Sequence, residues 1–221
     1  MHRHLDEELK ELNASILKMG NFTQEAIFKS IEALKDRNKD LAKDVIEKDT
    51  SIDALELEID EKCIDIIARY QPMAGDLRFI TTGMKINAEL ERIADIAVDI
   101  AQRTLELVDK PLLKPLIDIP KLTVVAQEMV KMTIDSFIKA DIELARKVLL
   151  MDPEADQLRN LIQKELIEDY MVKDGKTAPR AVQLLLIARF LERICDHATN
   201  IAEDVIYMVK AEVVKHHPEK L

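Results

Sequence analysis

The chain has 221 residues, of which 48% are hydrophobic and 33% charged, and its formal net charge is −10. This balance is typical of a globular protein and excludes a disordered or membrane-spanning chain. The negative charge argues against nucleic-acid binding, which needs clustered Lys and Arg, and against direct contact with anionic lipid. Only four Gly and no Trp occur, and the amino-acid composition is otherwise typical of long helices, so it predicts an all-α fold.

Two cysteines, Cys63 and Cys195, fall among apolar positions at helical spacing, and neither belongs to a CxxC motif. We expect buried thiols in a reducing, cytoplasmic environment. The charged N-terminal residues MHRHLDEELKEL contain no apolar segment, so no signal peptide is predicted. No stretch approaches the ~18 uncharged apolar residues of a transmembrane helix. Any association with a membrane is therefore expected to run through a protein partner.

Periodic apolar residues predict three long helices in the first half of the chain. Between Leu5 and Ala33 the apolar and small residues alternate spacings of four and three, as in a helix of a bundle. The polar run 35–40 ends this helix, and a short amphipathic stretch leads into the second. The segment 70–76 contains Pro and Gly, which predicts a turn before a third helix that ends near residue 108.

The prolines within residues 109–120 mark the clearest boundary in the chain, because proline cannot donate a backbone hydrogen bond inside a helix. Beyond this boundary the same pattern starts again. We expect three further helices, near residues 120–139, 153–172 and 178–210.

The second half of the chain repeats the first. Residues 40–53 align with 143–156 at an offset of 103, and residues 90–101 align with 191–202 at an offset of 101. Identity in two places, in the same order, indicates a duplicated unit of about a hundred residues. The sequence therefore predicts six main helices in two tandem homologous three-helix bundles, at residues 1–108 and 121–221, joined by a Pro-rich linker at 109–120.

A stripe of acids recurs in the third helix of each copy. The two stripes are Glu91, Asp95 and Asp99, and Glu192, Asp196 and Asn200. At 100° per residue, each stripe is centred more than 90° from the centre of the apolar face of its helix. We therefore expect these side chains at the edge or outside of each bundle rather than in its core.

The second helix of each copy adds a matching pair of acids, Asp49 with Asp53 and Asp152 with Asp156. If the turn after the second helix centres near residue 73, antiparallel packing places Asp53 level with about residue 93, among the acids of the stripe. The same convergence recurs in the second copy. Such carboxylates favour a multivalent cation between them, and their oxygens suit Mg²⁺, Ca²⁺, Mn²⁺ or iron better than zinc.

Ordinary structural roles compete with metal binding. Exposed acids are usually only solvated, since a like-charge pair four residues apart costs just ~0.2–0.5 kcal/mol. Asp152 precedes Pro153 and could instead cap a helix N-terminus. Arg92 and Arg193 could neutralise part of each stripe. His197 lies 100° further round the helix than its acidic neighbour and is expected at the surface or loosely packed, outside the ligand set.

Three segments, QPMAGDLR (71–78), LERIADIAVDIA (90–101) and LERICDHATNIA (191–202), resemble the PhoU family of phosphate-uptake regulators. The resemblance covers essentially the whole chain. It implies two three-helix bundles whose acidic E(D)xxxD motifs hold multinuclear metal clusters, described with iron or zinc. Asn200 replaces an acid, which implies weaker binding in the second half. The identity of the metal stays open among iron, zinc, magnesium and manganese. The implied ligands are Asp49, Asp53, Glu91, Asp95, Asp99, Asp152, Asp156, Glu192, Asp196 and Asn200.

The resemblance also implies regulation without catalysis. Similar proteins act beside the ATPase subunit of the high-affinity phosphate ABC transporter and beside a membrane sensor histidine kinase, and they repress the phosphate-starvation response when phosphate is plentiful. For this chain the resemblance implies a cytoplasmic homodimer that reaches the inner membrane only through partners. Inorganic phosphate is a candidate ligand of the bound metal.

Three other functions compete with this one. A carboxylate-bridged di-iron enzyme needs Glu-x-x-His motifs that point into the core, and the sequence has none. A metal-dependent phosphatase would find enough acids to hold its metals, but no nucleophile or general base is evident. A purely structural helical adaptor would hold no metal, and metal analysis of protein purified without chelator distinguishes it.

Overall fold

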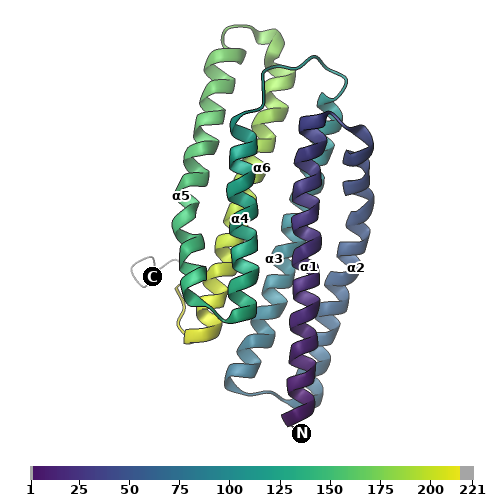
Figure 1. The fold of residues 1–221 in the computed structure, drawn as a ribbon, viewed down its shortest axis with the longest axis vertical. Helices are drawn as coiled ribbons and strands as arrows, with labels where there is room; N and C mark the ends of the chain where they lie inside the picture. The colour runs from purple at the N-terminus through teal and green to yellow at the C-terminus, as the bar shows by residue number, and fades with distance from the viewer. Residues whose placement is uncertain (1, 215–221) are drawn as a thin grey trace.

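The computed structural model describes residues 2–214, so Met1 and the end of the second predicted bundle (215–221) lie outside the described part. Six long α-helices run nearly parallel to one another (Figure 1), and no strand occurs within residues 2–214. The all-α prediction is confirmed. The elements are α1 (His2–Asp36), α2 (Lys39–Tyr70), α3 (Ala74–Leu107), α4 (Asp118–Lys139), α5 (Ile142–Glu165), the π-helix η1 (Leu166–Met171), the 3₁₀ turn η2 (Gly175–Thr177) and α6 (Ala178–Lys210).

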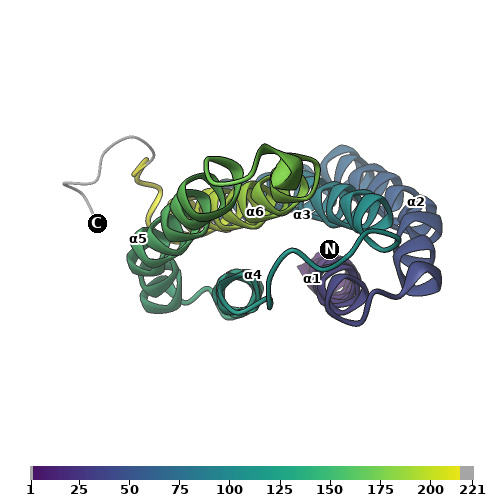
Figure 2. The same ribbon diagram turned by 90° about the horizontal axis from the view of Figure 1, so that it is seen from above.

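The helices form two three-helix bundles, as predicted, with α1 to α3 in one and α4 to α6 in the other. Figure 2 shows α3 and α6 side by side in the middle of the molecule, with α1 and α4 facing each other across the same junction. The helices α2 and α5 lie at opposite outer edges. None of the helices in the described part of the chain is long and apolar enough to cross a membrane.

The second helix of each bundle begins in the same way. Asn38 precedes α2, and its side chain accepts hydrogen bonds from the backbone N–H groups of Asp40 and Leu41. Asp141 precedes α5 and accepts from the second and third residues after it in the same manner. Such caps each stabilise a helix by about 1 kcal/mol. The offset of 103 relates Asn38 to Asp141, so the duplication extends to these caps.

The start predicted for the fifth helix, at residue 153, is wrong. The helix α5 begins at Ile142 and runs through Pro153. Proline inside a helix removes one backbone hydrogen bond, but Val148 and Ala155, on either side of it, are both buried in the same core. Because this burial holds the helix together across the proline, Asp152 lies in mid-helix and caps nothing.

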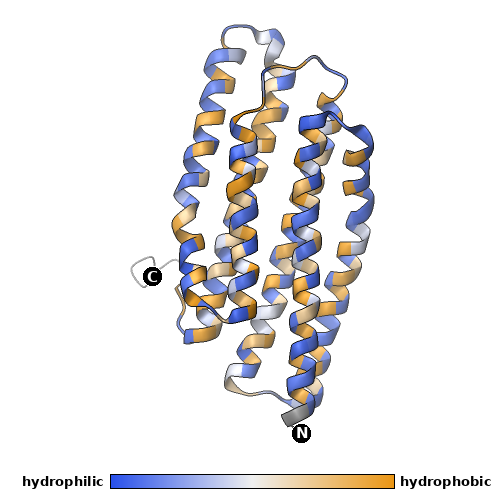
Figure 3. Ribbon diagram, viewed as in Figure 1, coloured by the Kyte–Doolittle hydropathy of each residue, from blue (hydrophilic) through white to orange (hydrophobic). Residues whose placement is uncertain are grey.

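The hydrophobic core runs through both bundles without a break. Each long helix carries an apolar stripe beside a polar one (Figure 3). Most buried apolar residues of both halves form one contiguous cluster, and a second, smaller cluster consists of Ala33, Ala42, Val45 and Ala101. Phe79 of α3 stacks on Phe137 of α4, with ring centroids 5.0 Å apart. Gly20 of α1 lets α4 approach closely, because a Cβ at that position would lie 2.5 Å from Cδ1 of Ile134.

Two features agree with local predictions from the sequence. Cys63 and Cys195 are buried free thiols, as expected. Burial raises the pKa of Cys63 to about 12, so this thiol is unreactive at neutral pH.

The Pro-rich segment between α3 and α4 contains no helix, and Arg37 anchors its start by donating to the carbonyl oxygens of Val108 and Lys110 at 2.5 and 2.6 Å.

Candidate metal centre

The acids of α2 and α3 face each other in the first bundle. We call Asp49, Asp53, Glu91, Asp95 and Asp99 the first acid cluster. Asp53 and Asp95 are exposed, and the other three members are half-buried. None of the five lies in the core, so the structure places this cluster at the bundle edge, as predicted.

The charges of the first acid cluster act on one another across the two helices. Burial, and then the charges of Asp53 and Asp95, raise the pKa of Asp49 to about 6. Burial, and then the charges of Asp53 and Asp99, raise the pKa of Asp95. The antiparallel register brings acids of α2 and α3 to the same level, and there their charges repel one another. A bound cation would relieve this repulsion.

Two further acids extend the first cluster along α2, and sequence reasoning missed both. Glu56 and Asp60 continue the four-and-three spacing of Asp49 and Asp53, so the signal was present in the sequence. Burial, and then the charges of Asp60 and Asp53, raise the pKa of Glu56. Glu56 is also among the charges that raise the pKa of Glu91. The acid surface is therefore longer than predicted.

The equivalent residues of α5 and α6 converge in the second bundle. We call Asp152, Asp156, Glu192, Asp196 and Asn200 the second acid cluster. Burial, and then the charges of Asp196 and Asp156, raise the pKa of Asp152. Burial, and then Glu192, raise the pKa of Asp196, although Arg189 lowers it. The same two-helix arrangement therefore occurs twice.

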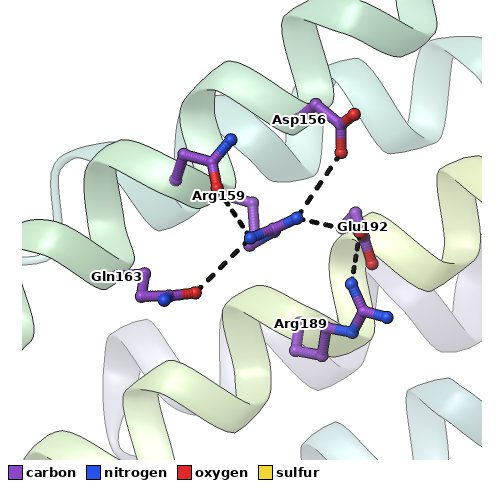
Figure 4. Close-up of polar contacts among 6 residues, drawn as sticks. Asp156, Arg159, Gln163, Arg189 and Glu192 are labelled. Atoms are coloured by element: carbon purple, nitrogen blue, oxygen red, sulfur yellow. Dashed lines mark hydrogen bonds and ion pairs between the residues drawn. The ribbon is translucent and has the colours of Figure 1, made fainter.

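The prediction that Glu192 lies outside the core is wrong. Glu192 is only 6% exposed, and its Oε1 accepts hydrogen bonds from Arg189 Nη1 and Arg159 Nη2 (Figure 4). Two guanidinium groups make this burial tolerable, because a buried carboxylate needs paired positive charge. In this half the arginines that pair with Glu192 are therefore Arg159 and Arg189.

Asn200 and His197 turn toward the first bundle. His197 Nδ1 lies 2.6 Å from Glu89 Oε2, and Asn200 Nδ2 donates to the same oxygen at 3.3 Å. The His197 side chain is only 13% exposed, so the prediction of a surface or loosely packed histidine is wrong. With its amide nitrogen bound to Glu89, Asn200 has only its amide oxygen left for a metal.

The similarity of this chain to known proteins follows the same division into two bundles. A family model described as the PhoU domain matches residues 16–104 and again 119–205, one match for each bundle. The chain belongs to the PhoU family. It is 43% identical over 212 residues to the Phosphate-specific transport system accessory protein PhoU homolog of Aquifex aeolicus, a match that covers 96% of both chains. It is 35% identical to the Escherichia coli accessory protein PhoU, covering 95% of this chain and 86% of that one.

Solved PhoU structures share the whole fold. The crystal structure of PhoU from Pseudomonas aeruginosa matches with a TM-score of 0.89 at 35% identity, covering 94% of this chain and 99% of that one. The phosphate transport system regulatory protein PhoU from Streptococcus pneumoniae matches with a TM-score of 0.88 at 29% identity, covering 95% and 99%. Each acid cluster lies within one of the two matched PhoU domains.

The donor chemistry of this PhoU family member suits a hard cation. All donors of both clusters are carboxylate or amide oxygens, which Mg²⁺, Mn²⁺, Ca²⁺ and iron accept. Glu192 Oε2 is buried without a hydrogen-bond partner, which leaves one oxygen of the second cluster free to coordinate. Within residues 2–214, no three His, Cys, Asp or Glu side chains are grouped closely enough to hold one ion as they stand. Coordination would therefore require rotation of the exposed members, such as Asp53 and Asp95.

Proposed function

We propose that this chain is a non-catalytic regulatory accessory protein of a phosphate transport system. The support is similarity over nearly the full length to relatives named Phosphate-specific transport system accessory protein PhoU or its homolog. A structural relative at 29% identity is described as a phosphate transport system regulatory protein. The similarity includes both bundles, so the proposal applies to the whole chain rather than to one half.

In this proposal the chain restrains phosphate uptake and the phosphate-starvation response when phosphate is plentiful. It docks on the ATPase subunit of the phosphate ABC transporter and on a sensor histidine kinase, as a cytoplasmic homodimer held at the inner membrane by these partners. Two similar bundles present two similar helical surfaces, which suits an adaptor that contacts two proteins. The net charge of −10 is consistent with protein partners rather than anionic lipid.

The two acid clusters are the proposed metal sites, and Asp49 carries this part of the proposal. A half-buried carboxyl with its pKa raised to about 6 beside two further carboxylates is stabilised by a cation. Asp49 and Asp53 would hold the metal from α2, and Glu91, Asp95 and Asp99 from α3. When bound, the metal would neutralise these acids and offer open coordination positions to phosphate oxygens.

A binding assay with both partners tests the adaptor role. The purified ATPase subunit and the cytoplasmic part of the kinase are passed over immobilised chain, with Mn²⁺ or with EDTA. We expect both partners to bind the Mn²⁺-loaded wild type, and to bind less well to Asp49→Asn/Asp95→Asn. If neither partner bound under any condition, the adaptor role would be wrong. If both bound equally with EDTA, the role of the metal in docking would be wrong.

Phosphate binding and catalysis need separate measurements. Equilibrium dialysis of the Mn²⁺-loaded protein against millimolar inorganic phosphate should show bound phosphate, and its absence would contradict coordination of phosphate by the metal. Under the same conditions we expect no turnover of a generic phosphate ester. Turnover that Asp95→Ala abolished would instead favour a metal-dependent phosphatase.

A further inference from the structure

A cavity of about 280 Å³ lies between α1 and α2 in the first bundle, and Val98 of α3 contributes to its lining. Its apolar lining includes the buried side chains of Val45 and Ile52 and the small side chain of Ala26. Protein interiors hold few voids larger than a water molecule, whereas pockets for small ligands are mostly apolar with a few polar groups. The volume corresponds to roughly nine water molecules at ~30 Å³ each, so it is large enough for a small ligand.

Two lysines, Lys29 and Lys48, line the same cavity. Lys29 Nζ lies 2.6 Å from Glu25 Oε1 and 3.1 Å from Asp44 Oδ2. Lys48 Nζ lies 3.0 Å from the same oxygen of Asp44, so the two ammonium groups are close enough for one anion to contact both. Each ammonium group has three N–H donors, and both lysines therefore retain donors beyond these contacts. Because Glu25 and Asp49 also line the cavity, a cationic ligand is the main alternative.

The duplication assigns an equivalent position in the second bundle. Asn38 N–H donates to the Ala33 carbonyl oxygen at the end of α1, and Asp141 N–H donates to that of Ser136 at the end of α4, each at 2.9 Å. Both pairs are related by the offset of 103, so this offset holds for α1 and α4 as well as for α2 and α5.

Methionine side chains replace part of the cavity lining in the second bundle. Ala26, Lys29 and Lys48 are equivalent to Met129, Met132 and Met151. Met129 is fully buried, and the other two pack against the core. The acids of the lining, Glu25 and Asp49, are instead retained as Glu128 and Asp152. Of the charged groups that line the cavity, only the lysines are replaced together with the small side chain of Ala26, which favours an anionic ligand over a cationic one.

We propose that the cavity between α1 and α2 binds a small amphipathic anion. Its apolar body lies against Ala26, Val45 and Ile52. Its head group, a carboxylate or a phosphate, accepts hydrogen bonds from Lys29 and Lys48. The volume limits the whole molecule to about ten non-hydrogen atoms. The inference is independent of the proposed metal sites, because neither lysine is a proposed metal ligand.

Calorimetric titration with probes of the same chain length tests the class of ligand. The full chain is titrated in EDTA with octanoate, octyl phosphate, octan-1-ol and octylamine, which have similar apolar bodies and differ in charge. We expect both anions to bind with a Kd of about 0.1 mM, and the tighter one identifies the preferred head group. The alcohol and the amine should bind at least about ten-fold more weakly, because they make no charge-assisted hydrogen bond to the lysines.

Three outcomes of this titration would overturn the inference. The first is that neither anion binds at millimolar concentration. The second is that octan-1-ol binds as tightly as octanoate, since the lysines would then not select an anion. The third is that octylamine binds more tightly than octanoate, which would assign the cavity to a cation held by Glu25 and Asp49.

Filling the cavity tests its location. Ala26→Met copies the second bundle, where Met129 is accommodated, and Ala14→Met makes the same change at an exposed position of α1. We expect Ala26→Met to bind octanoate at least about ten-fold more weakly than wild type, and Ala14→Met to match wild type. Circular dichroism checks that both variants keep their helices. Equal affinity of wild type and Ala26→Met for octanoate would show that the anion binds elsewhere and would overturn the inference.

Replacing the lysines tests the contact with the head group. Lys29→Met and Lys48→Met also copy the second bundle, and Lys43→Met is the matched control at an exposed position of α2. The double variant Lys29→Met/Lys48→Met should bind octanoate at least about ten-fold more weakly and octan-1-ol as wild type does. Lys43→Met should keep the preference for octanoate over octan-1-ol. An unchanged preference in the double variant would contradict the assigned role of the two lysines and overturn the inference.

Discussion

Arg159 of α5 donates a hydrogen bond through Nη2 to Oε1 of Glu192 on α6, and Arg189 donates to the same oxygen from within α6. The Arg159 contact joins α5, at the outer edge of the molecule, to α6 in its middle. The two contacts also explain how an acid of the repeated stripe comes to be only 6% exposed. The first bundle has Glu56 and Ala88 at the positions of the two arginines, and its Glu91 stays half-buried.

Replacement of Arg159 should destabilise the protein. We expect Arg159→Leu to lower the free energy of unfolding by about 1–3 kcal/mol, because Glu192 would keep only one of its two charged donors. Urea denaturation followed by circular dichroism measures this. In Arg159→Leu/Glu192→Gln the loss should be smaller, since the buried negative charge is gone. Equal losses in the single and double variants would show that Arg159 stabilises through packing alone.

The raised pKa of Asp49 predicts that the metal-free protein loses stability as pH rises. The folded-state pKa of about 6 lies above the ordinary value of 3.8. The contribution of protonated Asp49 to the free energy of unfolding is therefore fully present below about pH 4 and is lost as the pH rises through 6. We expect Asp49→Asn to be more stable than wild type at pH 7 by about 1 kcal/mol, once solvent screening is allowed for.

Urea unfolding of wild type and of Asp49→Asn in the presence of EDTA, between pH 4 and 8, measures this dependence. Glu47→Gln, an exposed change on the same helix, is the control and should follow the wild type. A difference between Asp49→Asn and wild type that stayed constant across this range would contradict the prediction.

Restoring the acid at residue 200 should weaken the junction between the bundles. Asn200 Nδ2 donates to Glu89 Oε2, whereas the substitution Asn200→Asp would set a second carboxylate against that of Glu89. We expect Asn200→Asp to cost about 1 kcal/mol in metal-free protein, from the lost hydrogen bond and the repulsion. Thermal unfolding with EDTA measures the cost. The loss should shrink in Asn200→Asp/Glu89→Gln, and an unchanged loss would exclude Glu89 as its cause.

Close approach of α1 and α4 at Gly20 predicts a limit on side-chain size. Gly20→Leu should destabilise the protein by about 1–3 kcal/mol, because the new side chain would overlap Ile134. Ile134→Ala should recover part of this loss in the double variant. Gly75→Leu serves as a comparison, since a Cβ there meets nothing within 4 Å. Similar stability of Gly20→Leu and wild type would show that the two helices separate easily.

The fold followed from the sequence because its signals are local and occur twice. Apolar spacing predicted long helices, and the offsets of 103 and 101 predicted two similar bundles. The start of α5 was missed because Pro153 is a strong local stop signal, whereas burial on both sides of it is a tertiary effect. A single-helix pattern does not reveal such burial.

The candidate site was only partly predictable. The angular positions of Glu91 and Glu192 on their helices predicted that both side chains lie at the edge or outside of their bundles. Arg159 reaches Glu192 from another helix. Such a contact between helices cannot be read from the spacing along one of them. His197 was misplaced for the same reason, since Glu89 approaches it from the other bundle. Glu56 and Asp60 were visible in the spacing along α2.

Metal content of the purified protein tests the central claim most directly. Wild type, Asp95→Ala and Asp196→Ala are purified without chelator and compared by elemental analysis. We expect bound metal in the wild type, a large loss in Asp95→Ala, and a smaller loss in Asp196→Ala, because arginines already neutralise part of the second cluster. Equal metal content in all three proteins would show that neither acid cluster is a metal site.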